Sequence, residues 1–173
     1  IHGSGHKSTS WNKVLLYMKN SKEILCPNLS SILNNKEASY DNLYSSFEAY
    51  CNEIDGKIDL CGLSLGGILA LNFAIDYPNK VEKLVLIGTP YKIPKFLFKL
   101  QGVIFHIMPK STFEKMGCKK RDFISLVSSM SDLYIETNLD KIDCKALILC
   151  GIKDNQNMEN AKLLNENIKN SPL

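Results

Sequence analysis

The chain has 173 residues, of which 45% are hydrophobic and 23% are charged, and its formal net charge is +3. These values are typical of a single soluble globular domain that is long enough to bury a sizeable core. They argue against a nucleic-acid-binding protein, because Arg121 is the only arginine and no dense basic stripe carries interleaved aromatic residues.

The first residues predict a strand end, a loop and a helix, in that order. Ile1 ends an expected strand, and residues 2–9 form a loop rich in Gly and Ser. Ser10 can then cap a helix whose apolar residues recur on one face. These residues are Trp11, Val14, Leu15 and Met18.

Residues 24–54 predict a short strand, a loop and a longer helix. Ile24 to Cys26 is a short apolar run before Pro27, and residues 28–39 are a polar loop. Apolar residues then recur at spacings of three and four from Tyr40 to Ile54, which predicts an amphipathic helix.

A serine between two glycines occupies the next switch from strand to helix. Gly62 to Gly66 reads Gly-Leu-Ser-Leu-Gly, after the apolar run from Ile58 to Cys61 and before the apolar run from Ile68 to Ile75. This is the nucleophile-elbow pattern, in which the serine takes a strained backbone conformation. Side chains in place of the two glycines would collide with neighbouring backbone. The alternative interpretation is an ordinary glycine-rich turn.

The alternation of short apolar strands with helices continues and predicts the fold class. Val81 to Ile87 is the next strand, and Ala146 to Cys150 is the last, followed by a helix from Asn157 to Asn170. This order predicts an α/β fold with a mostly parallel sheet and helices on both faces. Active sites of such sheets lie at one end of the strands, so we expect the residues that follow strands to gather there. These residues are His2, Ser64, Thr89 and Asp154.

Residues 91–139 break this rhythm and predict a helical cap inserted after the strand that ends near Ile87. We expect no further division of residues 1–173, which form one domain with this insertion. The apolar residues from Phe96 to Met108 line an acyl pocket in one interpretation and pack the cap onto the core in the other. A helix that touches a lipid surface is a third alternative, since the run is too short for a membrane span.

Three separated motifs together resemble the α/β-hydrolase superfamily, and most closely its small capped esterase-like members. The motifs are His-Gly-Ser-Gly from His2, the elbow around Ser64, and Gly-Ile-Lys-Asp ending at Asp154. The resemblance implies that Ser64 is the nucleophile and Asp154 the acid that orients a histidine. It also implies that the amides of Ser4 and Leu65 form the oxyanion hole, and that His2 and Gly3 support the loop. Asp76 and Asp132 are fallback acids.

The chain departs from the family's order of Ser, Asp and His, because no histidine follows Asp154. His6 is expected at the rim of the loop, and His106 as a packing residue in the cap. The chain starts at Ile1 rather than Met and stops directly after a helical run. We therefore expect a longer protein cut at both ends, with the catalytic histidine beyond the C-terminus and the 173-residue fragment inactive. Whether a signal peptide has been removed stays an open question.

The predicted function is a serine hydrolase that acts on a small carboxylic ester or thioester through an acyl-enzyme. The alternatives are a non-catalytic binding module of the same fold and an acyltransferase or peroxidase variant. The six cysteines show neither a C-x-x-C pair nor zinc-ligand spacing, so we expect no metal, no cofactor and a reducing, cytoplasmic location. We also expect no nucleic-acid partner. The acyl chain length and the oligomeric state stay open.

Overall fold

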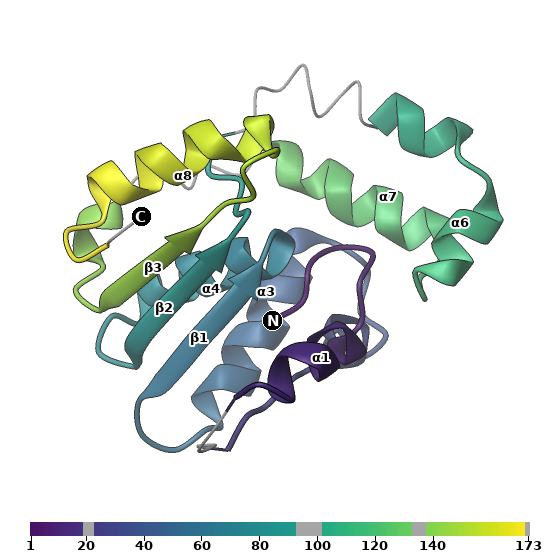
Figure 1. Cartoon of the computed structure of the whole chain (residues 1–173). Coiled ribbons are helices and arrows are strands. Elements are labelled where there is room, and N and C mark those ends of the chain that lie inside the picture. Colours follow the sequence, from purple (N-terminus) through teal and green to yellow (C-terminus); the bar gives the residue numbers. More distant parts are fainter. Residues whose placement is uncertain (19–22, 93–101, 133–137, 172–173) are drawn as a thin grey trace.

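The computed structural model describes residues 1–18, 23–92, 102–132 and 138–171. Its centre is a parallel sheet whose described strands are β1 (Ile58–Leu63), β2 (Val81–Ile87) and β3 (Lys145–Leu149), in the order β1-β2-β3 (Figure 1). Leu84 in the middle strand pairs with Leu60 on one side and Ala146 on the other. The sheet confirms the predicted α/β fold, and its parallel strands all end at the same edge.

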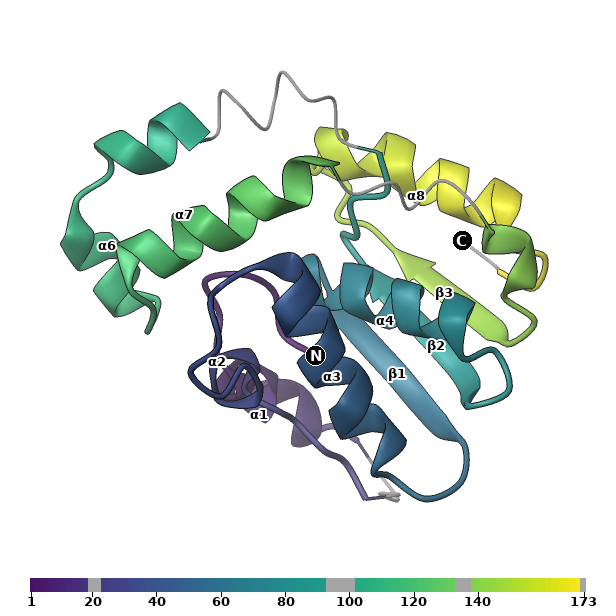
Figure 2. The ribbon, with the colours of Figure 1, turned by 180° about the vertical axis from the view of Figure 1, so that it is seen from behind.

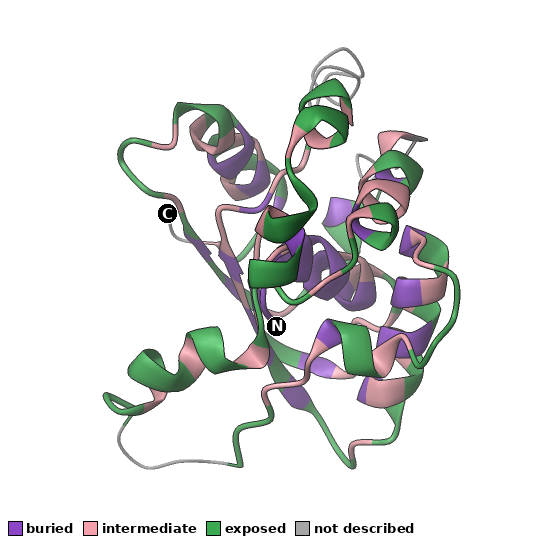
Figure 3. Cartoon of the chain, turned by 90° about the vertical axis from the view of Figure 1, so that its right-hand side faces the viewer, coloured by how far each residue is buried: buried purple, intermediate pink, exposed green. Residues whose placement is uncertain are grey.

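Helices cover both faces of this sheet. Figures 1 and 2 show α3 (Tyr40–Asn52) and α4 (Leu65–Asp76) on one face, and α8 (Asn155–Asn167) on the other, over β3. The first seven residues of α4 are all buried, because this helix is apolar on every side. Figure 3 shows the buried residues concentrated where the sheet meets its helices.

The N-terminal part differs from the prediction in three places. The expected helix from Ser10 to Met18 is two short turns, η1 (Ser8–Trp11) and α1 (Asn12–Leu15). Residues 24–26 form no strand, and Ile24 and Leu25 are exposed. No described strand runs beside them to supply the backbone partners that a strand needs. The predicted polar loop contains α2 (Leu29–Ile32), whose first turn is capped because the Asn28 side chain accepts a hydrogen bond from the Ser30 amide at 3.2 Å.

The segment between β2 and β3 is helical where it is described. Residues 102–107 are helical, and α6 (Lys110–Lys115), α7 (Lys120–Ser129), η2 (Met130–Asp132) and η3 (Leu139–Lys141) follow. Figures 1 and 2 show α6 and α7 beyond the carboxyl ends of the strands. Phe96 to Phe98 lie outside the described residues. Within the described residues, no helix combines the length and the apolar character that crossing a bilayer requires.

An aromatic cluster holds the described helices of this segment together. The ring centroids of Phe105 and Phe123 are 5.1 Å apart with perpendicular planes, and Phe113 packs against both rings. One end of α7 is attached to the body of the molecule, since the Tyr40 amide donates a hydrogen bond of 2.8 Å to the Ser129 hydroxyl. The segment therefore has a small apolar core of its own and a polar tie to α3.

Candidate active site

Ser64 lies between β1 and α4 with a backbone conformation that non-glycine residues rarely adopt. Its φ and ψ angles are 51° and −114°, and such conformations cost about 1–3 kcal/mol. Ser64 is the N-cap residue of α4, yet its hydroxyl makes no capping hydrogen bond. Its amide donates to the carbonyl of Ile87 at 2.9 Å, which ties the turn to the end of β2. The strained turn therefore holds a serine whose hydroxyl is not used to cap the helix.

The glycines around Ser64 allow backbone segments to approach more closely than any side chain permits. A Cβ atom on Gly62 would lie 2.2 Å from the carbonyl oxygen of Gly66, and one on Gly66 would lie 2.5 Å from that of Ile1. Both obstacles are backbone atoms, so the collision predicted from the sequence is confirmed. A Cβ atom on Gly67 would meet the hydroxyl of Thr89 at 2.0 Å. That hydroxyl is buried and has no hydrogen-bond partner among the described residues.

His2 anchors the loop that passes next to Ser64. Its side chain is 4% exposed, and its Nε2 accepts a hydrogen bond from the Leu29 amide at 3.0 Å. Because Nε2 is the acceptor, the proton of the neutral ring is on Nδ1, which donates to the carbonyl of Gly3 at 2.9 Å. Burial lowers the pKa of His2, in keeping with this neutral form. Both ring nitrogens are thus committed to the backbone.

A tight turn brings the same loop against Ser64. The amide of His6 donates to the carbonyl of Gly3 at 3.2 Å, and Gly5 has a φ of 73°, as position i+2 of a type II turn requires. A Cβ atom on Gly3 would lie 3.3 Å from the Cβ atom of Ser64. The amides of Ser4 and Leu65 have no acceptor among the described residues.

Asp154 lies at the end of the neighbouring strand β3, in the loop before α8. Its carboxylate accepts hydrogen bonds from the amide of Asn157 at 3.2 Å and from the side chain of Asn157 at 2.8 Å. A Cβ atom on Gly88 would lie 3.6 Å from Asp154 Oδ2. Since the preceding residue, Ile87, binds the Ser64 amide, Ser64 and Asp154 flank the end of β2. The structure thus gathers the loop from His2, Ser64 and Asp154 at one edge of the sheet.

The remaining candidates lie elsewhere or are engaged. Asp76 is at the far end of α4 from Ser64, where it accepts a hydrogen bond from the Tyr44 hydroxyl. Asp132 is in η2. His106 is exposed on the helix of residues 102–107, and its Nδ1 is 2.7 Å from the carbonyl oxygen of Gly102.

Asn160 is a buried polar residue that the sequence analysis missed. Its side-chain oxygen accepts hydrogen bonds from the amides of Tyr91 at 3.1 Å and Lys92 at 2.7 Å. Asn160 therefore fixes the backbone where the chain leaves β2 for the helical segment. The only sequence signal was an Asn in a helix that also contains two exposed asparagines, Asn155 and Asn167.

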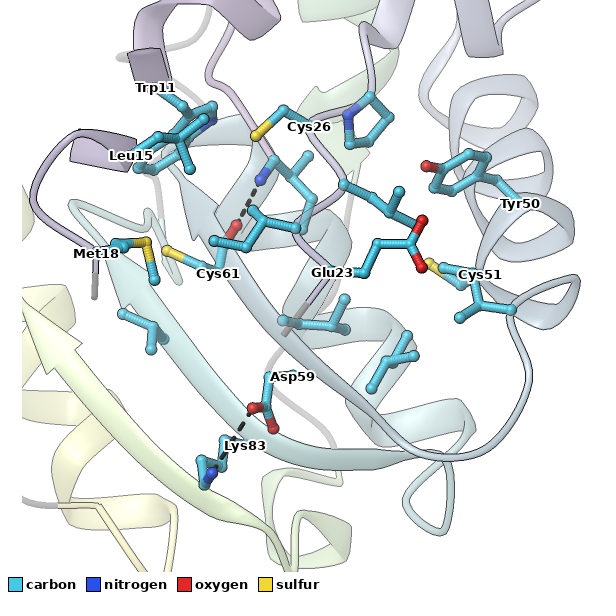
Figure 4. Close-up of a pocket in the computed structure, with 18 of the residues that line it drawn as sticks. Trp11, Leu15, Met18, Glu23, Cys26, Tyr50, Cys51, Asp59, Cys61 and Lys83 are labelled. Atoms are coloured by element: carbon cyan, nitrogen blue, oxygen red, sulfur yellow. Dashed lines mark hydrogen bonds and ion pairs between the residues drawn. The ribbon is translucent and has the colours of Figure 1, made fainter. Parts of the chain in front are cut away.

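A cavity of about 770 Å³ lies beside β1, and Ser64 is not among its lining residues. Figure 4 shows its wall, which includes Trp11, Cys26, Cys51 and Cys61. Across the described ranges, no three or more His, Cys, Asp or Glu side chains are grouped as metal ligands. His2, Ser64, Thr89 and Asp154 are likewise not among the residues that line this cavity.

No family model matches the chain. A pimeloyl-[acyl-carrier protein] methyl ester esterase of Aromatoleum aromaticum is 33% identical over 89 residues, which cover 51% of this chain and 35% of that protein. A 2-hydroxy-6-oxo-2,4-heptadienoate hydrolase of Pseudomonas putida is 31% identical over 100 residues, with 51% and 35% covered. The chain spans about a third of the length of the curated relatives it matches.

A solved structure of a hydrolase from Pseudomonas aeruginosa superposes with a TM-score of 0.74 at 15% sequence identity, covering 98% of this chain and 77% of that one. The chain has the α/β-hydrolase fold. The superposition covers nearly the whole chain.

Proposed function

We propose that this α/β-hydrolase-fold chain carries the nucleophile of a serine hydrolase that acts on carboxylic esters or thioesters. The observation that carries the proposal is the backbone of Ser64, with φ of 51° and ψ of −114° between β1 and α4. The surroundings of Gly62 and Gly66 admit no side chain. Such strain persists only where the surrounding structure enforces it, and it concentrates at functional sites. The elbow turn also explains why the Ser64 hydroxyl does not cap its own helix.

The amides of Ser4 and Leu65 are our proposed oxyanion donors. Two facts support them: neither amide has an acceptor among the described residues, and Leu65 is the first residue of α4. Amides at a helix N-terminus favour a negative charge. Losing one such donor typically lowers kcat about 100- to 1000-fold. His2 and Gly3 would keep this loop in place.

We propose Asp154 as the acid of the triad and an imidazole from outside residues 1–173 as the base. Asp154 is supported by its position next to Gly88 at the end of β2. The histidines of this chain do not suit the role of base: His2 has both nitrogens engaged, and His106 lies on the helix of residues 102–107. His6 lies beside Gly3, near Ser64's loop, but it precedes Ser64 in the chain, whereas the family's base follows the acid.

The proposed reaction has two steps. In the first, Ser64 Oγ bonds to the acyl carbon as its proton passes to the base, and the leaving alcohol or thiol departs with that proton. In the second, water gives a proton to the base and attacks the acyl-enzyme, which releases the carboxylic acid and returns the proton to Ser64. The chemistry implies a small-molecule acyl substrate, as do the names of the esterase and hydrolase relatives.

We further propose that residues 91–139 act as a cap over this site and that the protein is cytoplasmic. The cap proposal is supported by the position of α6 and α7 beyond the strand ends (Figure 1). The location is supported by the six cysteines, all of which are free.

The test is to follow acyl transfer onto Ser64 itself. The chain is incubated with p-nitrophenyl acetate and added imidazole, digested, and examined by mass spectrometry. We expect an acetyl group on the peptide that contains Ser64, and none at that position in the Ser64→Ala variant. Acetylation confined to lysines, equal in both proteins, would contradict the proposal and favour a non-catalytic binding module.

A further inference from the structure

His6 and Ser64 face the same small space beside Gly3. A Cβ atom on Gly3 would lie 3.3 Å from the Cβ atom of Ser64 and 3.6 Å from Nδ1 of His6. Because Gly3 has no side chain, Ser64 and the His6 ring both approach the same side of its backbone. His6 is exposed, so a molecule that reaches Ser64 can also reach this ring.

The hydrogen bonds of His6 leave one edge of its ring available. Its Nδ1 is 3.2 Å from the carbonyl oxygen of Ser4, which can only accept. With Nδ1 donating there, Nε2 makes no hydrogen bond among the described residues and is left for a ligand. The same turn that fixes the Ser4 amide therefore also fixes the direction of the imidazole.

The surroundings of His6 favour a negatively charged ligand. Residues 1–18 contain no carboxylate side chain and include His6 and Lys7. A Cβ atom on Gly117 would lie 2.8 Å from Nζ of Lys7, so this ammonium group lies between the loop and the turn after α6. Residues 110–121 carry five cationic side chains and one carboxylate, that of Glu114. Asp154, the acid at the strand ends, is bound to Asn157.

We propose that His6 is a specificity-determining residue that binds a carboxylate group carried by the substrate close to its scissile carbonyl. The inference deepens the proposed function and rests on it, because Ser64 marks the position of that carbonyl. An imidazolium bound to a carboxylate makes a charge-assisted hydrogen bond, which is stronger than one between neutral groups. The site then prefers acyl esters that bear a second, ionised carboxyl group over neutral esters of the same length.

The experiment measures binding rather than turnover, so it does not depend on a catalytic base. The imidazole signals of the three histidines are followed by NMR while the Ser64→Ala chain is titrated with monomethyl succinate, an anion, or with neutral dimethyl succinate. The signals are assigned with His2→Gln, His6→Gln and His106→Gln variants. His106 is the internal control, because it is exposed but lies on the helix of residues 102–107.

We expect monomethyl succinate to shift the His6 signals saturably and the His106 signals little, and dimethyl succinate to shift neither. His6→Gln, introduced into the same chain, should weaken binding of the anion about tenfold or more, as the loss of one charge-assisted hydrogen bond implies, whereas His106→Gln should not. Equal shifts at His6 and His106, or no shift at His6, would overturn the proposal. Specific binding without acetylation of Ser64 would overturn the proposed function instead.

Discussion

The backbone amide of Leu29 donates a hydrogen bond of 3.0 Å to Nε2 of His2, across 27 positions of the chain. Leu29 is the first residue of α2, and amides in the first turn of a helix have no acceptor within it. His2 therefore satisfies a helix end with one nitrogen and holds the carbonyl of Gly3 with the other. One buried imidazole thus connects the start of α2 to the loop that faces Ser64.

This arrangement predicts that stability falls in mild acid. Burial lowers the pKa of His2, so below its ordinary value of about 6.5 the unfolded chain binds a proton that the folded chain does not. The contribution is fully present above about pH 6.5 and is lost as the pH falls toward the lowered pKa. We expect urea unfolding between pH 7.5 and 5.5 to show this slope, and His2→Gln to flatten it.

His106→Gln is the matched control, because His106 is exposed and should leave the slope unchanged. His2→Gln should also lower the stability at pH 7.5 by about 1–3 kcal/mol, since two buried backbone groups lose their partner. An unchanged slope in His2→Gln would show that the buried imidazole is not the group responsible.

The elbow predicts a large difference between two Gly→Ala substitutions. Gly66→Ala places a methyl group 2.5 Å from the carbonyl oxygen of Ile1, and a backbone obstacle cannot rotate away. We expect a loss of about 3 kcal/mol or more in the free energy of unfolding. Gly102→Ala is the control, because a Cβ atom there meets nothing within 4 Å. A Gly66→Ala variant as stable as Gly102→Ala would show that the turn is not as tight as described.

The elbow was predictable because its constraint is local. The pattern around Ser64 is a serine between glycines with an apolar run on each side. These few consecutive residues are enough to predict a strand that ends where a helix begins. The short run from Ile24 to Cys26 was not predictable, because an apolar segment of this length becomes a strand only if another strand pairs with it. The four-residue helix α2 was hidden in a polar stretch: its cap at Asn28 is a local contact, but the bond of its first amide to His2 joins positions 27 apart.

The buried contacts of Asn160, and the approach of His6 to Gly3, could not have been predicted from the sequence either. Asn160 binds an amide 69 positions away, and no periodicity signals such a contact. His6 lies beside Gly3, which is against Ser64, only because Gly5 takes a φ of 73° and the turn folds the ring back. The roles of both residues depend on contacts with other segments, whereas the elbow depends on five consecutive residues.

We predict that replacing Asn160 loosens the backbone where the chain leaves β2. Asn160→Ala removes the acceptor that the amides of Tyr91 and Lys92 share, and we expect a loss of about 1–3 kcal/mol. Hydrogen exchange of these two amides should accelerate more than exchange in β2. Asn167→Ala, in the same helix but exposed, should change the stability by about 0.5 kcal/mol or less. Equal effects of both variants would contradict this role of Asn160.

The aromatic cluster predicts that Phe105 stabilises the helical segment. Its ring is half-buried against Phe113 and Phe123, so Phe105→Ala should cost about 2 kcal/mol, somewhat less than for a fully buried ring. Ile107→Ala is the control, since Ile107 is 78% exposed on the same helix. Hydrogen exchange in α6 and α7 reports the effect. A change in acyl chain-length preference without loss of stability would instead place Phe105 in the acyl pocket.

We propose that Ser64 is a nucleophile whose base lies outside residues 1–173. Loss of a triad member lowers kcat on the order of a millionfold in one serine protease. The chain alone should therefore show no turnover that depends on Ser64. Added imidazole supplies a base in solution and should restore part of it.

The decisive measurement is the hydrolysis rate of p-nitrophenyl acetate by the chain and by Ser64→Ala, each with and without imidazole. We predict equal rates without imidazole, and a faster rate for the chain than for Ser64→Ala when imidazole is present. Equal rates in both conditions would contradict the role of Ser64. Turnover that depends on Ser64 without imidazole and disappears in His6→Gln would place the base inside the chain and contradict the proposed triad.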